Sequence, residues 1–107
     1  MNNLDATFSA LADPTRRAIL ARLASSEATV GELSRPFDIT PPAISRHLRV
    51  LEHAQLIKRE RRGQHQVCRL EAQGLADANA WLERYRQFWT DAFEQLDQHL
   101  KSKGTPK

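Results

Sequence analysis

Apolar residues recur at helical spacing through the first third of the chain. Leu4, Phe8 and Leu11 are three or four positions apart and predict a short first helix. Asp13 is a typical helix N-cap, and Pro14 fits the first helical position because the N–H that proline lacks would have no partner there. A second helix is therefore expected from Pro14, with an apolar stripe made by Ile19, Leu20 and Leu23.

A short third helix is expected after Thr29. Thr29 and Glu32 have the spacing of a capping box, in which each side chain bonds the backbone N–H of the other residue. Pro36 should end or kink this helix, because its ring clashes with an earlier carbonyl. The following stretch "FDIT" then forms a turn, in which we expect Phe37 and Ile39 to be buried.

Two adjacent prolines fix the start of a fourth helix. Thr40 is a good N-cap, and Pro41 and Pro42 occupy first-turn positions whose N–H groups have no helical partner. The helix should run to about Ala54. Its inward stripe is Ile44, Leu48 and Leu51. Its outward positions are Ala43, Ser45, Arg46 and Arg49.

The helical spacing of apolar residues gives way to a strand-like pattern in "LIKRERRGQHQVCRL". Leu56 to Glu60 and Gln66 to Leu70 read as two short strands of a charged β-hairpin, with Gly63 in the turn. One long helix is then expected from Ala72 to about Leu100, and residues 101–107 are expected to form a flexible tail. The predicted fold is mainly α with a small β-hairpin: a winged helix-turn-helix of about five helices and a two-stranded wing.

Length and composition favour a single soluble domain. A chain of 107 residues is large enough for one modest core, and 40% hydrophobic with 27% charged residues is ordinary for a globular protein. The N-terminus lacks the basic and apolar regions of a secretory signal, and no apolar run is long enough to span a membrane. The single cysteine, Cys68, fits a reducing compartment, so the expected location is the cytoplasm.

Charge distribution is more informative than the net charge of +3. From Pro41 to Arg69, seven lysines and arginines stand against two carboxylates, whereas the segment from Glu71 onward is close to neutral. A positive field concentrated in one segment is expected of a protein that binds a polyanion, although a solvated basic face gives the same composition.

The basic segment coincides with the predicted helix-turn-helix and wing. The second helix of such a motif enters the major groove of DNA with its N-terminal residues first. Small residues at the N-terminus of this helix allow it to approach the bases closely. Arg46 is the first candidate for a base contact, because its guanidinium can donate to guanine O6 and N7 at the same time. The expected groups on this helix are Pro42, Ala43, Ser45, Arg46, His47 and Arg49. The wing would contact the DNA backbone or minor groove through Arg59, Arg61, Arg62, Gln64 and His65.

From about Leu4 to Leu100 the chain resembles the ArsR/SmtB family of bacterial winged-helix regulators. The resemblance lies in "FSALADPTRRAILARL" and "TVGELSRPFDITPPAISRHLRVLEHAQLIKRERRGQHQVCRL", most specifically in "ISRHLRVLEHAQLIKRERRGQ". It implies a homodimeric repressor that binds a two-fold symmetric operator in double-stranded DNA and, typically, releases it when an effector binds. It also places Thr40, Pro42, Ala43, Ser45, Arg46 and His47 on the DNA-facing helix, and Arg61 to His65 at the wing tip.

The chain departs from the metal-sensing members of that family. Thr29, Gly31 and Ser34 stand where those sensors carry cysteines, and neither a hydroxyl nor a glycine is a soft-metal ligand. In the last predicted helix, Asp97 and His99 are two positions apart and so do not share a helix face. We therefore expect no metal and no cofactor. We also expect the chain to belong to the branch of the family that lacks the metal-binding cysteines. An effector, if there is one, would be an unidentified small molecule.

Two roles are open for Cys68. Nearby arginines would favour a thiolate and hence a redox switch. Strand alternation instead groups Cys68 with Gln66 and Leu70, which favours a half-buried packing role.

Five of the seven aromatic residues fall in the last predicted helix. They widen its apolar surface beyond a single stripe, which indicates either a larger core contact or a dimer interface, where large aromatics are enriched. The expected dimer residues are Leu4, Phe8, Trp81, Tyr85, Phe88, Trp89, Phe93 and Leu96.

An enzyme is not expected. The serines have no nucleophile-elbow context, and there is no phosphate-binding glycine loop. The alternatives to a sequence-specific DNA-binding regulator are a winged-helix module that binds an acidic protein surface, and a nonspecific nucleic-acid binder, including one that binds RNA through the wing.

Overall fold

The computed structural model describes residues 4–104, with side chains described for residues 4–101. Two helices, α1 (Leu4–Leu11) and α2 (Pro14–Ser25), come first. A short strand β1 (Ala28–Thr29), helix α3 (Val30–Ser34) and the 3₁₀ helix η1 (Arg35–Phe37) lead to α4 (Pro41–His53). Strands β2 (Ile57–Arg62) and β3 (His65–Leu70) precede α5 (Ala72–Glu83) and α6 (Arg86–Gly104).

The predicted helix starts are confirmed by their caps. The Asp13 carboxylate accepts from the Arg16 N–H at 3.0 Å, and the Thr40 hydroxyl accepts from the Ala43 N–H at 3.3 Å. Thr29 and Glu32 form the complete capping box, with N–H to oxygen distances of 2.8 and 3.1 Å. Because these bonds are local, three helix N-termini could be predicted from residue spacing without knowledge of any tertiary contact.

The hairpin is longer than predicted and belongs to a three-stranded antiparallel sheet of order β1-β3-β2. Arg62 pairs with His65, so Gly63 and Gln64 alone make the turn, and Gly63 takes the left-handed φ of 62°. Strand β1 was not predicted. Its two residues pair with Cys68 and Val67 of β3, and so tether the base of the wing to the segment before α3.

The core lies where α2, α3 and α4 meet the base of the wing. The predicted inward stripe of α4 is fully buried, together with the strand residues that follow it. Phe37 and Ile39 are only partly buried, at the edge of this core. The largest fully buried side chains are Ile19, Leu33, Ile44, Leu48, Leu51, Leu56, Ile57, Thr7 and Cys68.

The prediction of one long helix from Ala72 to Leu100 is wrong. The chain turns between α5 and α6, where the Arg84 and Tyr85 N–H groups bond the carbonyls three residues earlier instead of four. No proline or glycine marks this tight turn in the sequence. The aromatic rings of Trp81 and Tyr85 contact across it, with centroids 5.0 Å apart. Residues 4–104 therefore form six α-helices, where about five were predicted.

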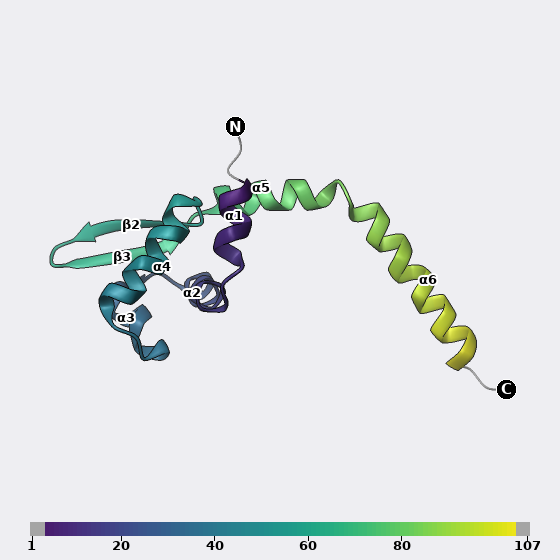
Figure 1. Ribbon diagram of the computed structural model, residues 1–107, viewed down its shortest axis with the longest axis horizontal. Helices are drawn as coiled ribbons and strands as arrows, with labels where there is room; N and C mark the ends of the chain where they lie inside the picture. Colours follow the sequence, from purple (N-terminus) through teal and green to yellow (C-terminus); the bar gives the residue numbers. More distant parts are fainter. Residues whose placement is uncertain (1–3, 105–107) are drawn as a thin grey trace.

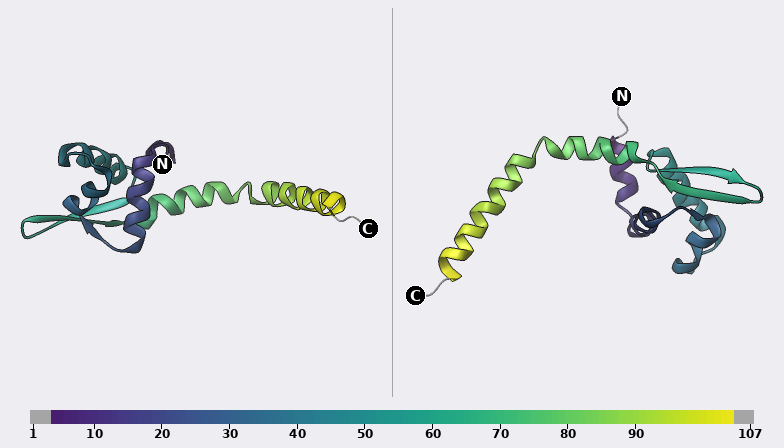
Figure 2. Two further views of the ribbon diagram at one scale, coloured as in Figure 1. Left: turned by 90° about the horizontal axis from the view of Figure 1, so that it is seen from below. Right: turned by 180° about the vertical axis from the view of Figure 1, so that it is seen from behind.

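The wing and α6 project from opposite ends of the molecule (Figure 1). Seen along other directions, α6 still extends away from the rest of the chain (Figure 2), and the overall extents are 67 × 36 × 20 Å. Helix α6 continues to Gly104, into the segment predicted as a tail, and residues 105–107 lie outside the described residues. Over the described part of the chain, no helix has the length and apolarity needed to cross a membrane.

Candidate nucleic-acid interface

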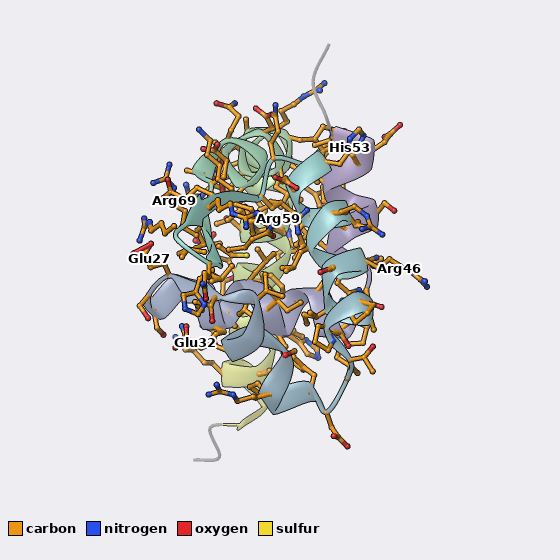
Figure 3. The ribbon with its side chains drawn as sticks, turned by 90° about the vertical axis from the view of Figure 1, so that its left-hand side faces the viewer. Glu27, Glu32, Arg46, His53, Arg59 and Arg69 are labelled. Carbon is orange, nitrogen blue, oxygen red and sulfur yellow. The ribbon has the colours of Figure 1, made fainter. Side chains whose placement is uncertain are left out.

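The outer face of α4 presents polar and basic groups to solvent. Thr40, Pro42, Arg46 and Arg49 are exposed, and Ala43 and Ser45 are half-buried. Arg46 points away from the body of the protein in Figure 3. Within the described part of the chain, neither the Arg46 nor the Arg49 guanidinium takes part in a hydrogen bond or an ion pair. Their donors are therefore available to an external acceptor.

His47 has a different setting from its neighbours on α4. Its Nδ1 lies 3.3 Å from Arg16 Nη1 and 3.9 Å from Asp13 Oδ2, both at the start of α2. Arg16 also donates to the carbonyls of Ser9 and Ala10. The backbone N–H of Arg16, followed by charge attraction from Arg16 and His47, lowers the pKa of Asp13. The His47 side chain thus connects α4 to the α1–α2 junction, whereas the Arg46 side chain is exposed to solvent.

Arg59 links the wing to α4. Its Nη2 donates to Glu52 Oε1 at 3.0 Å, and Nη1 lies 3.5 Å from Gln66 Oε1 on β3. Only 19% of the Arg59 side chain is exposed. Arg59, predicted as a DNA contact, therefore bonds to Glu52 of α4 and to Gln66 of β3 within the protein.

Arg62 near the wing tip is held by two carboxylates. Its guanidinium donates to Glu27 Oε1 at 2.9 Å and to Glu60 Oε1. These bonds raise the pKa of Arg62, and the bond from Arg62 lowers the pKa of Glu60. Arg61, Gln64 and His65 are exposed, and Arg61 has only a 3.4 Å contact with the Gly63 carbonyl. The tip is therefore polar and basic, with one arginine already paired.

A polar cleft of about 380 Å³ separates the wing from the helices. Ser45 of α4 lies on one side of it, and Gln64 and His65 of the wing lie on the other. The start of α3 closes the cleft, which is lined by Thr29, Val30, Gly31, Ser45, Gln64, His65 and Gln66. The structure thus brings together predicted residues from α4 and the wing that are about twenty positions apart in sequence.

The predicted dimer residues extend along one end of the molecule. Phe8 of α1 packs edge-on against Trp81 of α5, with ring centroids 5.6 Å apart. Phe88 is 75% exposed and Phe93 is 66% exposed on α6. Tyr85 and Leu96 are also exposed, whereas Leu4 and Trp89 are half-buried. This end of the chain leaves a large apolar surface in water.

The remaining candidate chemistry is confined to Cys68. The thiol is buried in the core, and burial raises its pKa to about 11, despite an opposing effect of the nearby Arg59 charge. Such a thiol is not activated for redox chemistry. In the region that the structure describes, no three His, Cys, Asp or Glu residues are grouped so that they could hold a metal ion.

Several residues that shape the interface were missed by the sequence reasoning. Glu27 reaches Arg62 across 35 positions, and Arg16 reaches His47 across 31. Glu52 holds Arg59 across seven positions, from helix to strand. Local spacing gives no signal for such pairs, because each depends on how the wing and α2 pack against α4.

Comparisons with known proteins agree with this geometry. A family model described as a helix-turn-helix domain matches residues 11–60. The HTH-type transcriptional regulator Rv2034 of Mycobacterium tuberculosis is 42% identical over 94% of this chain and 91% of its own length. The transcriptional repressor SdpR of Bacillus subtilis is 39% identical over 77% of this chain and 88% of its own length.

Solved structures show the same fold. The crystal structure of an ArsR family transcriptional regulator is 39% identical, covers 82% of this chain and 91% of its own, and superimposes with a TM-score of 0.76. A possible transcriptional regulator for arsenical resistance is 35% identical, covers 92% of this chain and 96% of its own, and gives a TM-score of 0.69. The chain belongs to the ArsR/SmtB family and is a DNA-binding transcriptional regulator of the ArsR type, not an enzyme.

Proposed function

We propose that this regulator is a homodimeric repressor that binds a two-fold symmetric operator through α4 and the wing. The observation that carries the proposal is the outer face of α4, where Arg46 and Arg49 are exposed without an internal partner beside a polar cleft to the wing. Arg46 would bond guanine in the major groove. The groups lining the cleft would bond the sugar–phosphate backbone of one strand.

The other proposed contacts follow from this docking. Thr40, Pro42 and Ala43 begin α4 and allow its N-terminus to approach the bases, while Arg61, Arg62, Gln64 and His65 meet the backbone or the minor groove. In this proposal Arg59 and His47 position the DNA-binding elements and do not contact DNA themselves. Arg59 positions the wing through Glu52, and His47 positions α4 against α2.

The dimer would form through the exposed apolar end of the molecule. Phe88 and Phe93 are too exposed to be core residues, and Leu96 continues the same apolar side of α6. Burying such side chains between two copies stabilises a dimer, because apolar surface leaves water. Two copies would place two α4 helices on half-sites about ten base pairs apart, or a multiple of that.

The signal that the regulator responds to would not be a metal bound in the α3 position of the metal-sensing members. Thr29 uses its hydroxyl in the capping box, and the Ser34 hydroxyl donates to the Gly31 carbonyl at 3.0 Å. Hydroxyls engaged in this way are poor ligands for soft metals. Because its proposed target is DNA, the regulator would work in the cytoplasm.

The experiment that tests this proposal is selection of bound duplexes from a randomised DNA pool, followed by affinity measurements at two salt concentrations. We expect a two-fold symmetric motif and an affinity that falls as salt rises, because phosphate contacts release counterions. Binding with a steep salt dependence but without any motif would overturn specific recognition. A motif without two-fold symmetry would overturn the dimeric arrangement.

A further inference from the structure

A second hollow lies on the other flank of α4, between α4 and α1. It has a volume of about 310 Å³, at the lower end of the range for small-molecule pockets. Ala6 and Ser9 form its α1 wall, and their small side chains leave the space open. Its α4 wall consists of Arg46, Arg49, Val50 and His53. We call this hollow the α1–α4 groove.

The groove combines an apolar floor with a positive rim. Its lining surface is mostly apolar, while two guanidiniums and an imidazole stand along α4, and none of the described lining residues is a carboxylate. Figure 3 shows Arg46 and His53 along α4, with α1 beside that helix. Arg46 and Arg49 have no ion pair within the described residues, so no described carboxylate neutralises the charge of these two guanidiniums.

The groove is separate from the proposed dimer surface. Phe8, which contacts Trp81 of α5, lies on a different side of α1 from Ala6 and Ser9. Ser9 is exposed, and its backbone carbonyl rather than its side chain accepts from Arg16. Both the apolar floor and the basic rim are therefore accessible to a small molecule in the dimer that we propose.

We propose that the α1–α4 groove binds a small amphipathic anion, an oxyanion head group on a hydrocarbon tail, and that this ligand competes with DNA. The tail would lie over Ala6 and Val50, and the head group would pair with the Arg46 and Arg49 forks, which match the geometry of a carboxylate or a phosphate. A bound ligand would occupy the guanidiniums needed at the operator. The competition, but not the binding, rests on the proposed DNA-binding function of α4.

The binding is tested with decanoate and decyl phosphate below their micelle concentrations, with decan-1-ol and butyrate as controls. Calorimetry should show both anions binding, and the controls at least about tenfold weaker, since each control lacks either the charge or the tail. Stronger binding of decyl phosphate or of decanoate identifies the preferred head group. In NMR spectra of the wild-type chain, the amide signals of Ala6, Ser9 and Val50 should shift. Shifts confined to α6 would overturn the groove as the site.

Ser9→Leu supplies the matched variant, because it fills the groove from α1 and replaces none of the proposed DNA-binding residues. It should weaken decanoate binding by at least about tenfold by steric exclusion and leave DNA binding without ligand unchanged. Arg49→Gln should weaken decanoate binding but leave decan-1-ol binding unchanged. Undiminished decanoate binding by both variants would overturn the proposal.

The competition is tested with a duplex from the selection described above. Decanoate should raise the dissociation constant of the wild-type complex and should have little effect on the Ser9→Leu complex. Groove binding with an unchanged DNA affinity would overturn the competition. If neither protein bound a duplex specifically without decanoate, the proposed DNA function would be wrong, whereas decanoate binding in the groove would still be judged by calorimetry and NMR.

Discussion

Arg46 and Arg62 are both exposed arginines of the basic segment, but they have different surroundings. Arg46 lacks a partner within the described chain, whereas Arg62 bonds Glu27 and Glu60. A free fork can bond a guanine edge directly. A paired arginine must first break its bonds to carboxylates before it can bond phosphates. Its net contribution to the free energy of DNA binding is therefore smaller.

Arg46→Ala should weaken binding to the selected operator by ~1–3 kcal/mol and relax the preference at one base position, because a bidentate base contact is lost. Arg46→Lys keeps the charge but not the fork, so it should retain the salt dependence and lose the base preference. Repeating the duplex selection with each variant measures both effects. Arg86→Ala, far away on α6, is the control, and an unchanged sequence profile for Arg46→Ala would contradict the proposed docking.

Arg62→Ala should weaken binding to all duplexes similarly and flatten the salt dependence, because a backbone contact carries charge but no sequence information. Glu27→Gln removes one carboxylate that holds Arg62 and should strengthen binding to all duplexes. Affinities for the operator and a scrambled duplex, each over a salt series, measure both changes. A loss limited to one sequence would show that the wing makes base-specific contacts instead.

Cys68 should react slowly with thiol reagents in the folded protein. Burial raises its pKa to about 11, which lowers the thiolate fraction near neutral pH, and the side chain is also inaccessible. Below the usual thiol pKa the group is neutral whether the chain is folded or unfolded. As pH rises from that value toward 11, the unfolded chain ionises first, so the free energy of unfolding should fall. Labelling at pH 8 with and without denaturant checks the reactivity, and fast labelling of the native protein would contradict the burial.

At the scale of elements, a glycine lets the start of α5 lie close against the turn after α4. The Gly74 N–H donates to the Gln55 carbonyl at 2.9 Å, and a Cβ on Gly74 would lie 2.5 Å from the Ala54 carbonyl oxygen. That oxygen belongs to the turn between α4 and β2, in which Gln55 has a left-handed φ of 60°. The start of α5 therefore sits directly on backbone that joins α4 to the wing.

Gly74→Ala should lower the free energy of unfolding by ~1–3 kcal/mol, because α5 must move away from the turn to make room for the methyl group. Denaturant unfolding measures the change. Gly31→Ala is the matched control, because its Cβ would meet only the Thr29 hydroxyl oxygen at 3.9 Å. A Gly74→Ala protein with the same free energy of unfolding as the wild type would show that α5 can move away from the turn without loss of stability.

At the scale of the whole molecule, α6 is an arm with few contacts to its own domain. It extends away from the core, and its apolar residues are more than half exposed at Phe88, Phe93, Leu96 and Leu100. A helix with such a surface is stabilised mainly by a partner rather than by its own propensity. The second copy that we propose would supply that partner.

Phe93→Ser should shift the protein from dimer to monomer at micromolar concentration, since it removes a large apolar side chain from the proposed interface. Size-exclusion chromatography with light scattering measures the mass. Gln98→Ser, on the side of α6 away from Trp89, Phe93 and Leu96, should leave the dimer intact. A Phe93→Ser protein that remained a dimer would remove this residue from the interface.

The sequence by itself determined the helix starts, the order of the elements and the basic segment. Asp13, Thr29 and Thr40 cap their helices through bonds to residues three positions away, so local spacing is sufficient to find them. The inward stripe of α4 was equally readable, because helical periodicity and burial follow the same 3.6-residue repeat.

The tertiary structure alone decided which polar side chains of the basic segment bond to residues of other elements. Arg59 and His47 have the same local sequence signals as Arg61 and Arg46, yet their partners, Glu52 and Arg16, come from other elements. The break between α5 and α6 likewise has no proline or glycine to announce it. Partners and bends of this kind depend on how helices and wing pack in space, and a one-dimensional pattern of residues does not contain that arrangement.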